Sequence, residues 1–417
     1  MPAVTVPAGG SGIAKGDLDK YICDSNEAVE FKLVRNPEDL ENDGCTFKPE
    51  MTHQVYGDEE RIFGYTGLNI KLYYSACRLT PYIGLAYKDK INPAKCDGVE
   101  ADQVLKPLSE YYPPGYFTNI DDFSAALIKD ASFRPFGELQ NQHKVYLGGS
   151  ERTFEVYSHD ISPPGFREFH ERMQTFILFF IDAASYIDTD DEKWRFFVMY
   201  EKYNVNGSPR YAAVGFTTVY EYYAYPNNIR PRISQMLVLP PFQQGGLGTQ
   251  MLQTIYNYYI AHKSVMDITV EDPSENFTRL RDYLDCKSCM KLPSYQAEKL
   301  MVGFTEEMAK EAQSKLRINK KQARRVYEIL RLHVTKRSDK ESYRNYRLHV
   351  KNRLNVQFKK EDNDMAKLKK ILKPEEFTAT MTMTSKDQRL ESLEHQYQEL
   401  EDHYSHILER LAGSDLS

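Results

Sequence analysis

The sequence lacks a secretory leader and any apolar run long enough to cross a membrane. The opening segment, MPAVTVPAGGSGIAKG, contains neither a basic stretch nor a hydrophobic one. The longest apolar run, FILFFI at 176–181, is far shorter than the ~20 residues that a transmembrane helix needs. We therefore expect no leader and no membrane partner.

Cysteine is also scarce, with six residues at irregular spacings in 417. That usage fits a reducing compartment and excludes a disulfide-rich secreted scaffold. Cys286 and Cys289 form a lone CxxC with no second pair nearby. We interpret them as two ordinary helix cysteines, and we expect no metal site.

The composition is that of a soluble globular protein, 41% hydrophobic and 27% charged, and the length predicts two to three domains. The net charge is −6, but residues 319–374 hold 18 Lys and Arg against 6 Asp and Glu, a local +12 that leaves −18 elsewhere. One interpretation is a solvated helical surface. The other is an acidic body for a basic ligand and a basic region for an acidic partner or nucleic acid. The overall pI of about 6.0 argues against a dedicated DNA-binding protein.

The hydrophobic pattern divides the chain into a mixed first part and a helical second part. Phenylalanines recur at helical spacing from Phe166 to Phe180 and predict a buried amphipathic helix. Asn206-Gly207 predicts a hairpin turn between two strands. Beyond Pro273 the pattern is mostly helical, and Leu390 to Leu411 form about three heptads. Those heptads could pair with a partner or pack on the chain's own basic helices.

The stretch LVLPPFQQGGLGTQML, Leu237–Leu252, is a glycine-rich loop between a predicted strand at 232–239 and a predicted helix at 248–261. A further strand is expected at 266–271. A helix N-terminus presents unpaired N–H groups, and glycine lets a phosphate approach the backbone, so the loop can hold an anion. It has no Gly-Lys-Ser/Thr for a P-loop and the wrong glycine spacing for a dinucleotide fold. A tight turn that simply needs glycine is the structural alternative.

Gln243-x-x-Gly246-x-Gly248 resembles the acetyl-CoA loop of the GNAT superfamily of N-acetyltransferases. Further blocks, among them RPRISQMLVLPPFQQGGLG, DITVEDPS, RPFGEL, GFREFHERMQTF and THQVYGDEERIFGYTGL, are similar to the type B histone acetyltransferase catalytic subunits. The resemblance runs from about residue 27 to at least 355.

This resemblance implies an α+β, mixed fold. A GNAT core, a mixed sheet with helices on both faces, would follow an N-terminal α+β domain and precede a C-terminal helical extension. The expected parts are a flexible N-terminus at 1–18, a histone-binding domain at 19–132, the acetyltransferase core at 133–272, a helical domain at 273–375, and a helical tail at 376–417.

The resemblance also implies the catalytic groups. A lysine ammonium, with a pKa near 10.4, must lose a proton before it can attack a thioester. Glu271, at the end of the expected strand, is the implied general base. Strand alternation would send Asp272 to the opposite face, and Asp182 is an auxiliary candidate because the family more often carries Glu there. No nucleophilic residue is needed.

Acetyl-CoA is the implied co-substrate. Its implied contacts lie on the strand before the loop, on the loop itself, and just past the catalytic strand: Met236, Leu237, Val238, Gln243, Gln244, Gly245, Gly246, Leu247, Gly248, Thr249 and Ser274. A backbone N–H of 236–238 would meet the developing oxyanion.

The implied acceptor is the tail of free, newly made histone H4, and of a second core histone. Its expected contacts are acidic and aromatic side chains: Asp58, Glu59, Glu60, Trp194, Tyr220, Glu221 and Tyr222. A propeller-type histone chaperone is the implied partner, and nucleus and cytoplasm are the implied location. Two alternatives stay open: an inactive histone-binding or chaperone subunit, and a small-molecule N-acetyltransferase, which the chain length disfavours.

Overall fold

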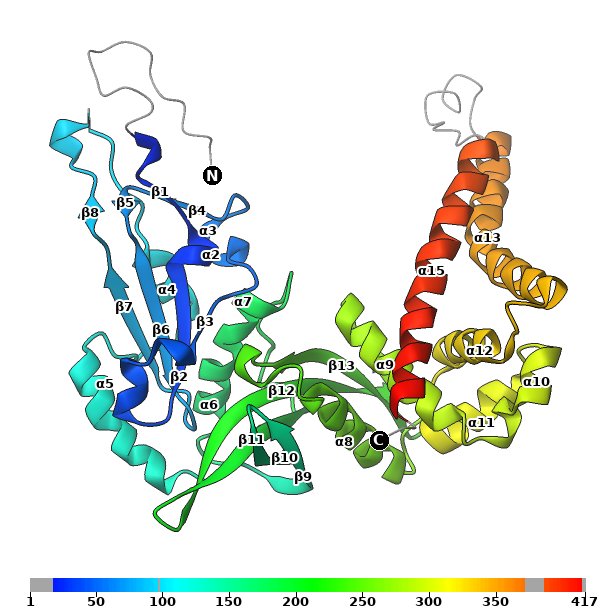
Figure 1. The fold of residues 1–417 in the computed structure, drawn as a ribbon, viewed down its shortest axis with the longest axis horizontal. Helices are drawn as coiled ribbons and strands as arrows, with labels where there is room; N and C mark the ends of the chain where they lie inside the picture. The colour runs from blue at the N-terminus through cyan, green and yellow to red at the C-terminus, as the bar shows by residue number, and fades with distance from the viewer. Residues whose placement is uncertain (1–17, 97, 372–385, 415–417) are drawn as a thin grey trace. The chain divides into compact units, whose positions relative to one another are not determined.

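The computed structural model describes residues 18–96, 98–371 and 386–414 (Figure 1). Nearly all of the predicted flexible segment 1–18, and residues 376–385 of the predicted tail, lie outside the described residues. The chain divides into two compact units. Unit 1 comprises Met1–Glu221 and Ile233–Thr254, and unit 2 comprises Tyr222–Arg232 and Ile255–Ser417.

Unit 1 begins with a small α+β region. Its main sheet has the order β3-β2-β6-β7, with β2 and β6 parallel and the other pairs antiparallel. The strands are β2 Val29–Val34, β3 Thr46–Phe47, β6 Asn69–Ser75 and β7 Pro81–Ala86; two short pairs join β1 Ile22–Asp24 to β4 Arg61–Phe63 and β5 Tyr65–Thr66 to β8 Asp89–Lys90. The helices are α2 Ser25–Ala28, α3 His53–Tyr56, α4 Leu105–Tyr111 and α5 Ile120–Ala126, with 3-10 turns η1 Pro37–Leu40, η2 Asp43–Cys45, η3 Pro93–Lys95 and η4 Leu127–Ser132.

The predicted amphipathic helix follows this region as three consecutive helical segments, α6 Phe166–Met173, η5 Gln174–Phe176 and α7 Ile177–Phe180. Its phenylalanines are buried, as the spacing predicted. Phe31 of β2 packs on three of them, with ring centroids 5.1 to 5.9 Å apart. This aromatic contact fixes α7 against the first sheet.

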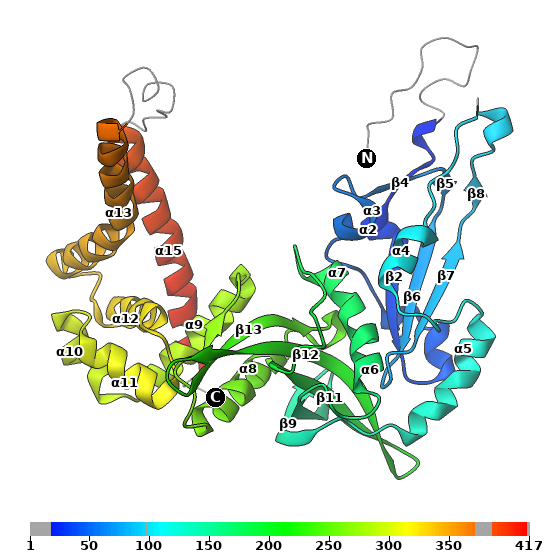
Figure 2. The same cartoon turned by 180° about the vertical axis from the view of Figure 1, so that it is seen from behind.

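A six-stranded sheet has the order β14-β13-β12-β11-β10-β9 (Figure 2). Its strands are β9 Glu138–Leu147, β10 Ser150–His159, β11 Trp194–Val205, β12 Ser208–Ala224, β13 Asn228–Val238 and β14 Thr269–Val270. Asn206 and Gly207 have φ of 51° and 78°, which confirms the predicted hairpin turn. The strand predicted at 232–239 and the helix predicted at 248–261 correspond to β13 and to α8 Leu247–Ala261.

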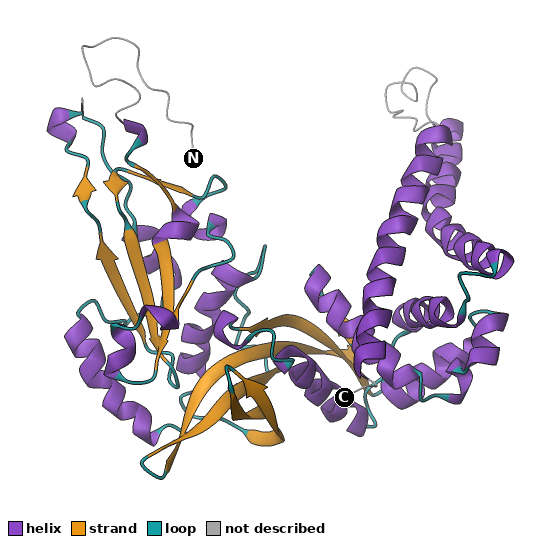
Figure 3. Cartoon of the chain, in the orientation of Figure 1, coloured by secondary structure: helices purple, strands orange, loops and turns teal. Residues whose placement is uncertain are grey.

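The second part of the chain is helical, as predicted (Figure 3). Its elements are α9 Glu275–Cys289, η7 Pro293–Tyr295, α10 Ala297–Val302, α11 Glu306–Leu316, α12 Lys320–Val334, α13 Lys340–Ile371 and α15 Lys386–Ser414. Cys286 and Cys289 are buried in α9, and burial raises the pKa of both thiols. They are helix core cysteines, as the sequence indicated.

The heptads of the tail lie on α15 and pack within the chain. Leu393, Tyr397, Tyr404, Ile407 and Leu411 are buried. The Tyr404 hydroxyl donates to Glu328 of α12 at 3.0 Å, and the Tyr343 hydroxyl of α13 donates to Glu401 at 2.6 Å. Of the two alternatives that the sequence left open, the structure shows packing on the chain's own helices.

The observed architecture confirms the mixed fold with a C-terminal helical extension. None of the helices in the described ranges is both long and apolar enough to cross a membrane.

Candidate active site

The glycine-rich loop joins β13 to α8 within a few residues. Pro240–Phe242 forms a 3-10 turn, η6, and the Phe242 side chain is buried and anchors it. The Gln243 amide donates to the Val238 carbonyl at 2.9 Å, which folds the loop back on the strand. The helix bond from Gln250 N–H to the Gly246 carbonyl, 3.2 Å, marks where α8 starts.

Two loop residues have left-handed backbone, Gln244 at φ 64° and Gly246 at φ 74°. Glycine adopts this conformation without strain, whereas a side chain costs roughly 1–2 kcal/mol there. A Cβ on Gly246 would meet nothing within 4 Å, so conformation and not crowding requires this glycine. A Cβ on Gly245 would lie 3.0 Å from Leu147 Cδ1. The first-turn N–H groups of α8, from Leu247, Gly248 and Thr249, therefore follow a loop shaped by glycine, as an anion site requires.

The end of β13 alternates between buried and half-buried residues. Leu237 is buried, and Met236 and Val238 are half-buried on the other face. Gly215 of β12 lies against the Leu237 carbonyl so closely that a Cβ would come within 2.3 Å of that oxygen. The carbonyl of Val214 accepts the N–H of Leu239 at 2.9 Å. Glycine on the neighbouring strand therefore permits close approach at the segment predicted to hold the pantetheine arm.

The strand predicted at 266–271 is shorter in the structure, because only Thr269–Val270 pair as β14. The flanking residues Val265 and Ile268 make isolated parallel bridges, to Ile229 and Ile318. Glu271 and Asp272 lie in a bend, and Asp272 has φ 31°. Strand alternation was expected to send Glu271 and Asp272 to opposite faces. That reasoning does not apply, because the strand ends at Val270, before both residues.

Glu271 is about half exposed, at 45%, and its Oε1 lies 3.9 Å from Arg232 Nη1. The Arg232 guanidinium in turn covers the ring of Tyr222, 4.8 Å from its centroid. The structure thus brings together a predicted base and a predicted substrate contact through Arg232, which sequence reasoning missed. Ser274 is the N-cap of α9, and its hydroxyl accepts the N–H of Phe277 at 3.2 Å.

Asp182 lies two residues beyond the end of α7, and its side chain is 74% exposed. The Asp182 carboxylate therefore lies at the solvent edge and is not buried among its apolar neighbours. His53 Nε2 lies 3.1 Å from Asp182 Oδ1, and His53 Nδ1 lies 3.7 Å from Glu60 Oε1. The side-chain amide of Gln54 donates to the carbonyls of Leu178 and Ile181, which holds α3 against the end of α7.

Glu60 differs from its neighbours in the predicted acidic cluster. Asp58 and Glu59 are exposed, whereas Glu60 accepts from the N–H of Thr52 at 2.7 Å, the N–H of His53 at 3.1 Å and Asn26 Nδ2 at 2.7 Å. The hydrogen bond from Thr52 is the largest cause that lowers the pKa of Glu60. Glu60 therefore orders the loop and connects it, through His53, to Asp182.

Trp194 and Tyr220 are cross-strand neighbours on β11 and β12, with ring centroids 5.0 Å apart in an edge-on arrangement. The Tyr220 hydroxyl donates to Asp191 Oδ2 at 2.7 Å, and this bond lowers the pKa of Asp191. Glu221 lies 3.7 Å from Arg195 Nε. Trp194 and Tyr220 thus form one aromatic pair joined to Asp191, because strand register places the two rings opposite one another. Glu221 follows Tyr220 on the same strand and pairs with Arg195 instead.

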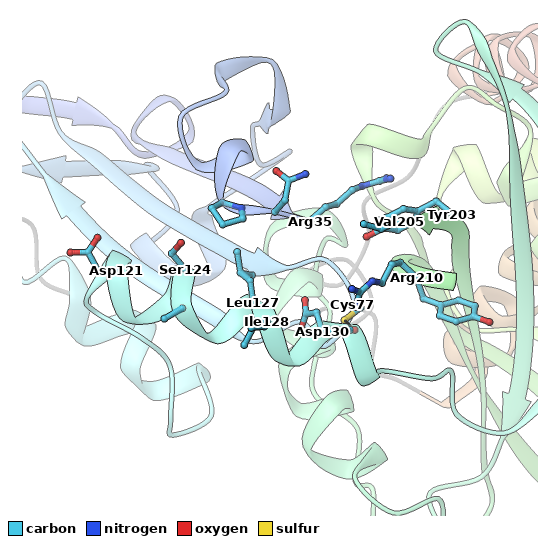
Figure 4. A pocket seen from close by; sticks show the side chains of 15 residues that line it. Arg35, Cys77, Asp121, Ser124, Leu127, Ile128, Asp130, Tyr203, Val205 and Arg210 are labelled. Carbon is cyan, nitrogen blue, oxygen red and sulfur yellow. Dashed lines mark hydrogen bonds between the residues drawn. The ribbon is translucent and has the colours of Figure 1, made fainter. Parts of the chain in front are cut away.

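A cavity of about 920 Å³ in unit 1 is separate from all predicted site residues (Figure 4). Arg35, Tyr203, Val205 and Arg210 line it, together with residues of α5 and η4 that include Asp130. The Arg35 guanidinium donates to Glu201 at 2.5 Å and covers the Tyr203 ring, and burial raises the pKa of Asp130. The charged groups that line the cavity are partly neutralised by carboxylates of the protein itself, as Arg35 is by Glu201, so they do not identify a ligand.

Comparison with known proteins gives matches over most of the chain. The family model described as "Histone acetyl transferase HAT1 N-terminus" matches residues 21–182, and "Histone acetyltransferase type B catalytic subunit, C-terminal" matches residues 281–332. The type B catalytic subunits of Rattus norvegicus and Homo sapiens are each 50% identical over 397 residues, which cover 95% of this chain and 94% of theirs. Among solved structures, an aminoglycoside acetyltransferase from a soil metagenomic sample covers 33% of this chain and 88% of its own, with 16% identity and a TM-score of 0.23.

Proposed function

The chain belongs to the family of type B histone acetyltransferase catalytic subunits, and we propose that it transfers acetyl from acetyl-CoA to tail lysines of free, newly synthesised histone H4 and of a second core histone. The observation that carries this proposal is 50% identity along 95% of the chain. The biological role would be in histone deposition and chromatin assembly, in nucleus and cytoplasm. A propeller-type histone chaperone is the proposed partner.

We assign the acetyl donor to the end of β13 and the loop before α8. The donor supplies an acetyl group activated as a thioester. The N–H groups at the start of α8 would bind its pyrophosphate, supported by the left-handed backbone of Gln244 and Gly246. A backbone N–H of Met236–Val238 would stabilise the oxyanion as the carbonyl is attacked.

Glu271 is our general base. It would take the proton as the lysine amine attacks the thioester carbonyl, so that the N–C bond forms, the C–S bond breaks and the thiolate leaves to be protonated. The support is its place in the bend directly after β14, where the carboxylate is half exposed and accessible to a substrate amine. Asp272 and Asp182 are auxiliary carboxylates in this scheme.

A cationic tail fits the acidic and aromatic surface of unit 1. Asp58, Glu59 and Asp182 are exposed carboxylates, and Trp194 with Tyr220 offers aromatic walls for the stem of a lysine. We include Glu60, Glu221 and Tyr222 as contacts on the resemblance of sequence. Glu60 would act mainly by ordering the loop.

The test is acetyl transfer from radiolabelled acetyl-CoA to free histones and to intact nucleosomes. We expect label on free H4 and none on nucleosomes. Absence of label on both would overturn the enzyme proposal. A retained affinity for free H4 in that case would favour the alternative, an inactive histone-binding subunit.

A further inference from the structure

The basic region singled out in the sequence divides into two sets of cations in the structure. The first set points toward α15 and α12. Arg353 of α13 donates to both oxygens of Glu328, at 2.6 and 2.8 Å, Lys351 bonds Glu394, and Arg337, just before α13, lies 3.5 Å from Glu401. These cations hold the helices of unit 2 together.

The second set points outward. Lys340, Arg344, Lys359 and Lys360 on α13, with Lys336 just before it, are all exposed. Among the side chains that the structure describes, none of these five makes an ion pair within 4.0 Å. These five cations therefore remain exposed after the helices of unit 2 have packed, four of them on α13.

Apolar side chains lie between these cations. Leu348 is 43% exposed and Val356 is 61% exposed. They are eight residues apart on one helix, which is two turns or ~12 Å. A groove of about 650 Å³ is lined by Val356 and by Arg353, Leu354, Gln357, Lys360, Asp364 and Gln396. We define the outer face of α13 as Lys340, Arg344, Leu348, Val356, Lys359 and Lys360.

We propose that this outer face binds an acidic protein segment with apolar side chains about two helical turns apart. Carboxylates of the segment would pair with Lys340 and Arg344 at one end and with Lys359 and Lys360 at the other. Its apolar residues would cover Leu348 and Val356 and remove their exposed apolar surface from water.

Duplex DNA fits this face less well than a protein segment does. DNA neutralises cations with phosphates, but its backbone offers no apolar partner for Leu348 and Val356. Four cations spread along a single helix also form a small footprint, in a chain whose net charge is −6. A carrier of basic proteins, by contrast, must itself be acidic, so a chain that modifies a free basic protein would meet such segments.

The experiment measures fluorescence anisotropy of the full chain with three probes. The first is a labelled peptide of about 20 residues, glutamate-rich with leucines two turns apart, long enough to span ~30 Å as a helix. The second replaces the leucines by alanine, and the third is a duplex DNA of equal charge. We expect the leucine peptide to bind at least tenfold more tightly than either of the others at physiological salt.

Two variants and one matched control locate the binding. Lys340→Glu with Arg344→Glu, and Leu348→Ser with Val356→Ser, should each weaken the leucine peptide about tenfold. The control, Lys106→Glu with Lys310→Glu, makes the same charge change at exposed lysines elsewhere and should leave affinity unchanged. Circular dichroism confirms folding, and acetyl transfer to a free H4 tail peptide should be the same in all of them.

Several results would overturn the proposal. DNA binding that equals or exceeds peptide binding would assign the face to nucleic acid. Equal binding of the two peptides, an effect of the control as large as that of the variants, or no measurable binding would leave a solvated face. A concentration-dependent dimer in sedimentation, abolished by both variants, would assign the face to a second copy of the chain.

Discussion

At the scale of single residues, Glu271 gives the sharpest prediction. Glu271→Gln keeps the size of the side chain but cannot take a proton, so kcat at neutral pH should fall by roughly 10²–10⁴. The loss should shrink as pH rises toward the pKa of the lysine amine, because more of the amine is then already neutral. KM for acetyl-CoA should stay the same.

The matched control for this substitution is Glu298→Gln, an exposed glutamate on α10 outside the proposed site. Steady-state rates across pH 6–10 decide the outcome. A Glu271→Gln enzyme with the wild-type rate at neutral pH would remove Glu271 from the role of base. The proposed function itself would survive, since Asp272 or Asp182 could then be tested in the same way.

His53 is the second residue with a consequence that can be measured. Its imidazole lies 3.1 Å from Asp182 and 3.7 Å from Glu60, so it limits the positions of an exposed carboxylate. His53→Ala and Asp182→Asn should each raise KM for an H4 tail peptide several-fold, and the double variant should be no worse than the worse single one. Additive effects in this cycle would show that the two side chains act independently.

At the scale of elements, the loop before α8 allows the conformational cost of a substitution to be distinguished from its effect on acetyl-CoA binding. Gly246→Val forces a β-branched residue into φ 74°, which costs roughly 1–2 kcal/mol and shifts the N–H groups proposed to hold the pyrophosphate. Gly207→Val imposes the same conformational cost at φ 78° in the β11–β12 turn. Both should lose similar stability, but only Gly246→Val should raise KM for acetyl-CoA. Equal KM values would argue against the loop as the acetyl-CoA site.

The buried face of α15 packs on other helices of unit 2, and its contribution to the free energy of unfolding can be tested at Tyr404. This side chain is buried and donates to Glu328, so Tyr404→Ala should cost roughly 3–5 kcal/mol in the unfolding of unit 2. Leu390 is 56% exposed on the same helix, and Leu390→Ala should cost well under 1 kcal/mol. Urea unfolding followed by helical ellipticity measures both. Equal costs would mean that α15 is not held by its buried face.

Elements with a regular pattern were predictable from the sequence, whereas their ends were not. β13, α8 and the Asn206-Gly207 turn follow from alternation, helical spacing and turn chemistry, which are local. β14 starts later than predicted because Val265 and Ile268, just before it, bridge to Ile229 and Ile318 instead, and nothing near Thr269 in sequence reveals that. Likewise, Arg232 beside Glu271 and His53 beside Asp182 are contacts across many residues. The sequence identifies a cluster of acidic residues at 58–60. Only the fold shows that Glu60 is held by hydrogen bonds within the protein while Asp58 and Glu59 are exposed.

At the scale of the whole molecule, acidification should destabilise the fold through buried histidines of unit 1. Burial lowers the pKa of His159 to about 4 and that of His170 to about 3. In the unfolded chain both have a pKa near 6.5, so below that pH the unfolded state binds more protons than the folded state. The free energy of unfolding should therefore fall as pH drops from about 6.5 toward 4, by up to ~1.4 kcal/mol per pH unit for each histidine.

The histidine effect should be partly offset in unit 2. Burial raises the pKa of Asp285 to about 6, so the folded state binds the extra proton between about pH 6 and 4, which favours folding as pH drops. Hydrogen exchange at pH 7 and pH 5 should show protection lost around His159 and His170 before α9. His170 packs between Phe166 and Phe196, and His170→Phe should flatten the pH dependence without lowering stability at pH 7 by more than about 1–3 kcal/mol. An unchanged slope in that variant would place the acid sensitivity elsewhere, because the only proton acceptor removed is the His170 imidazole.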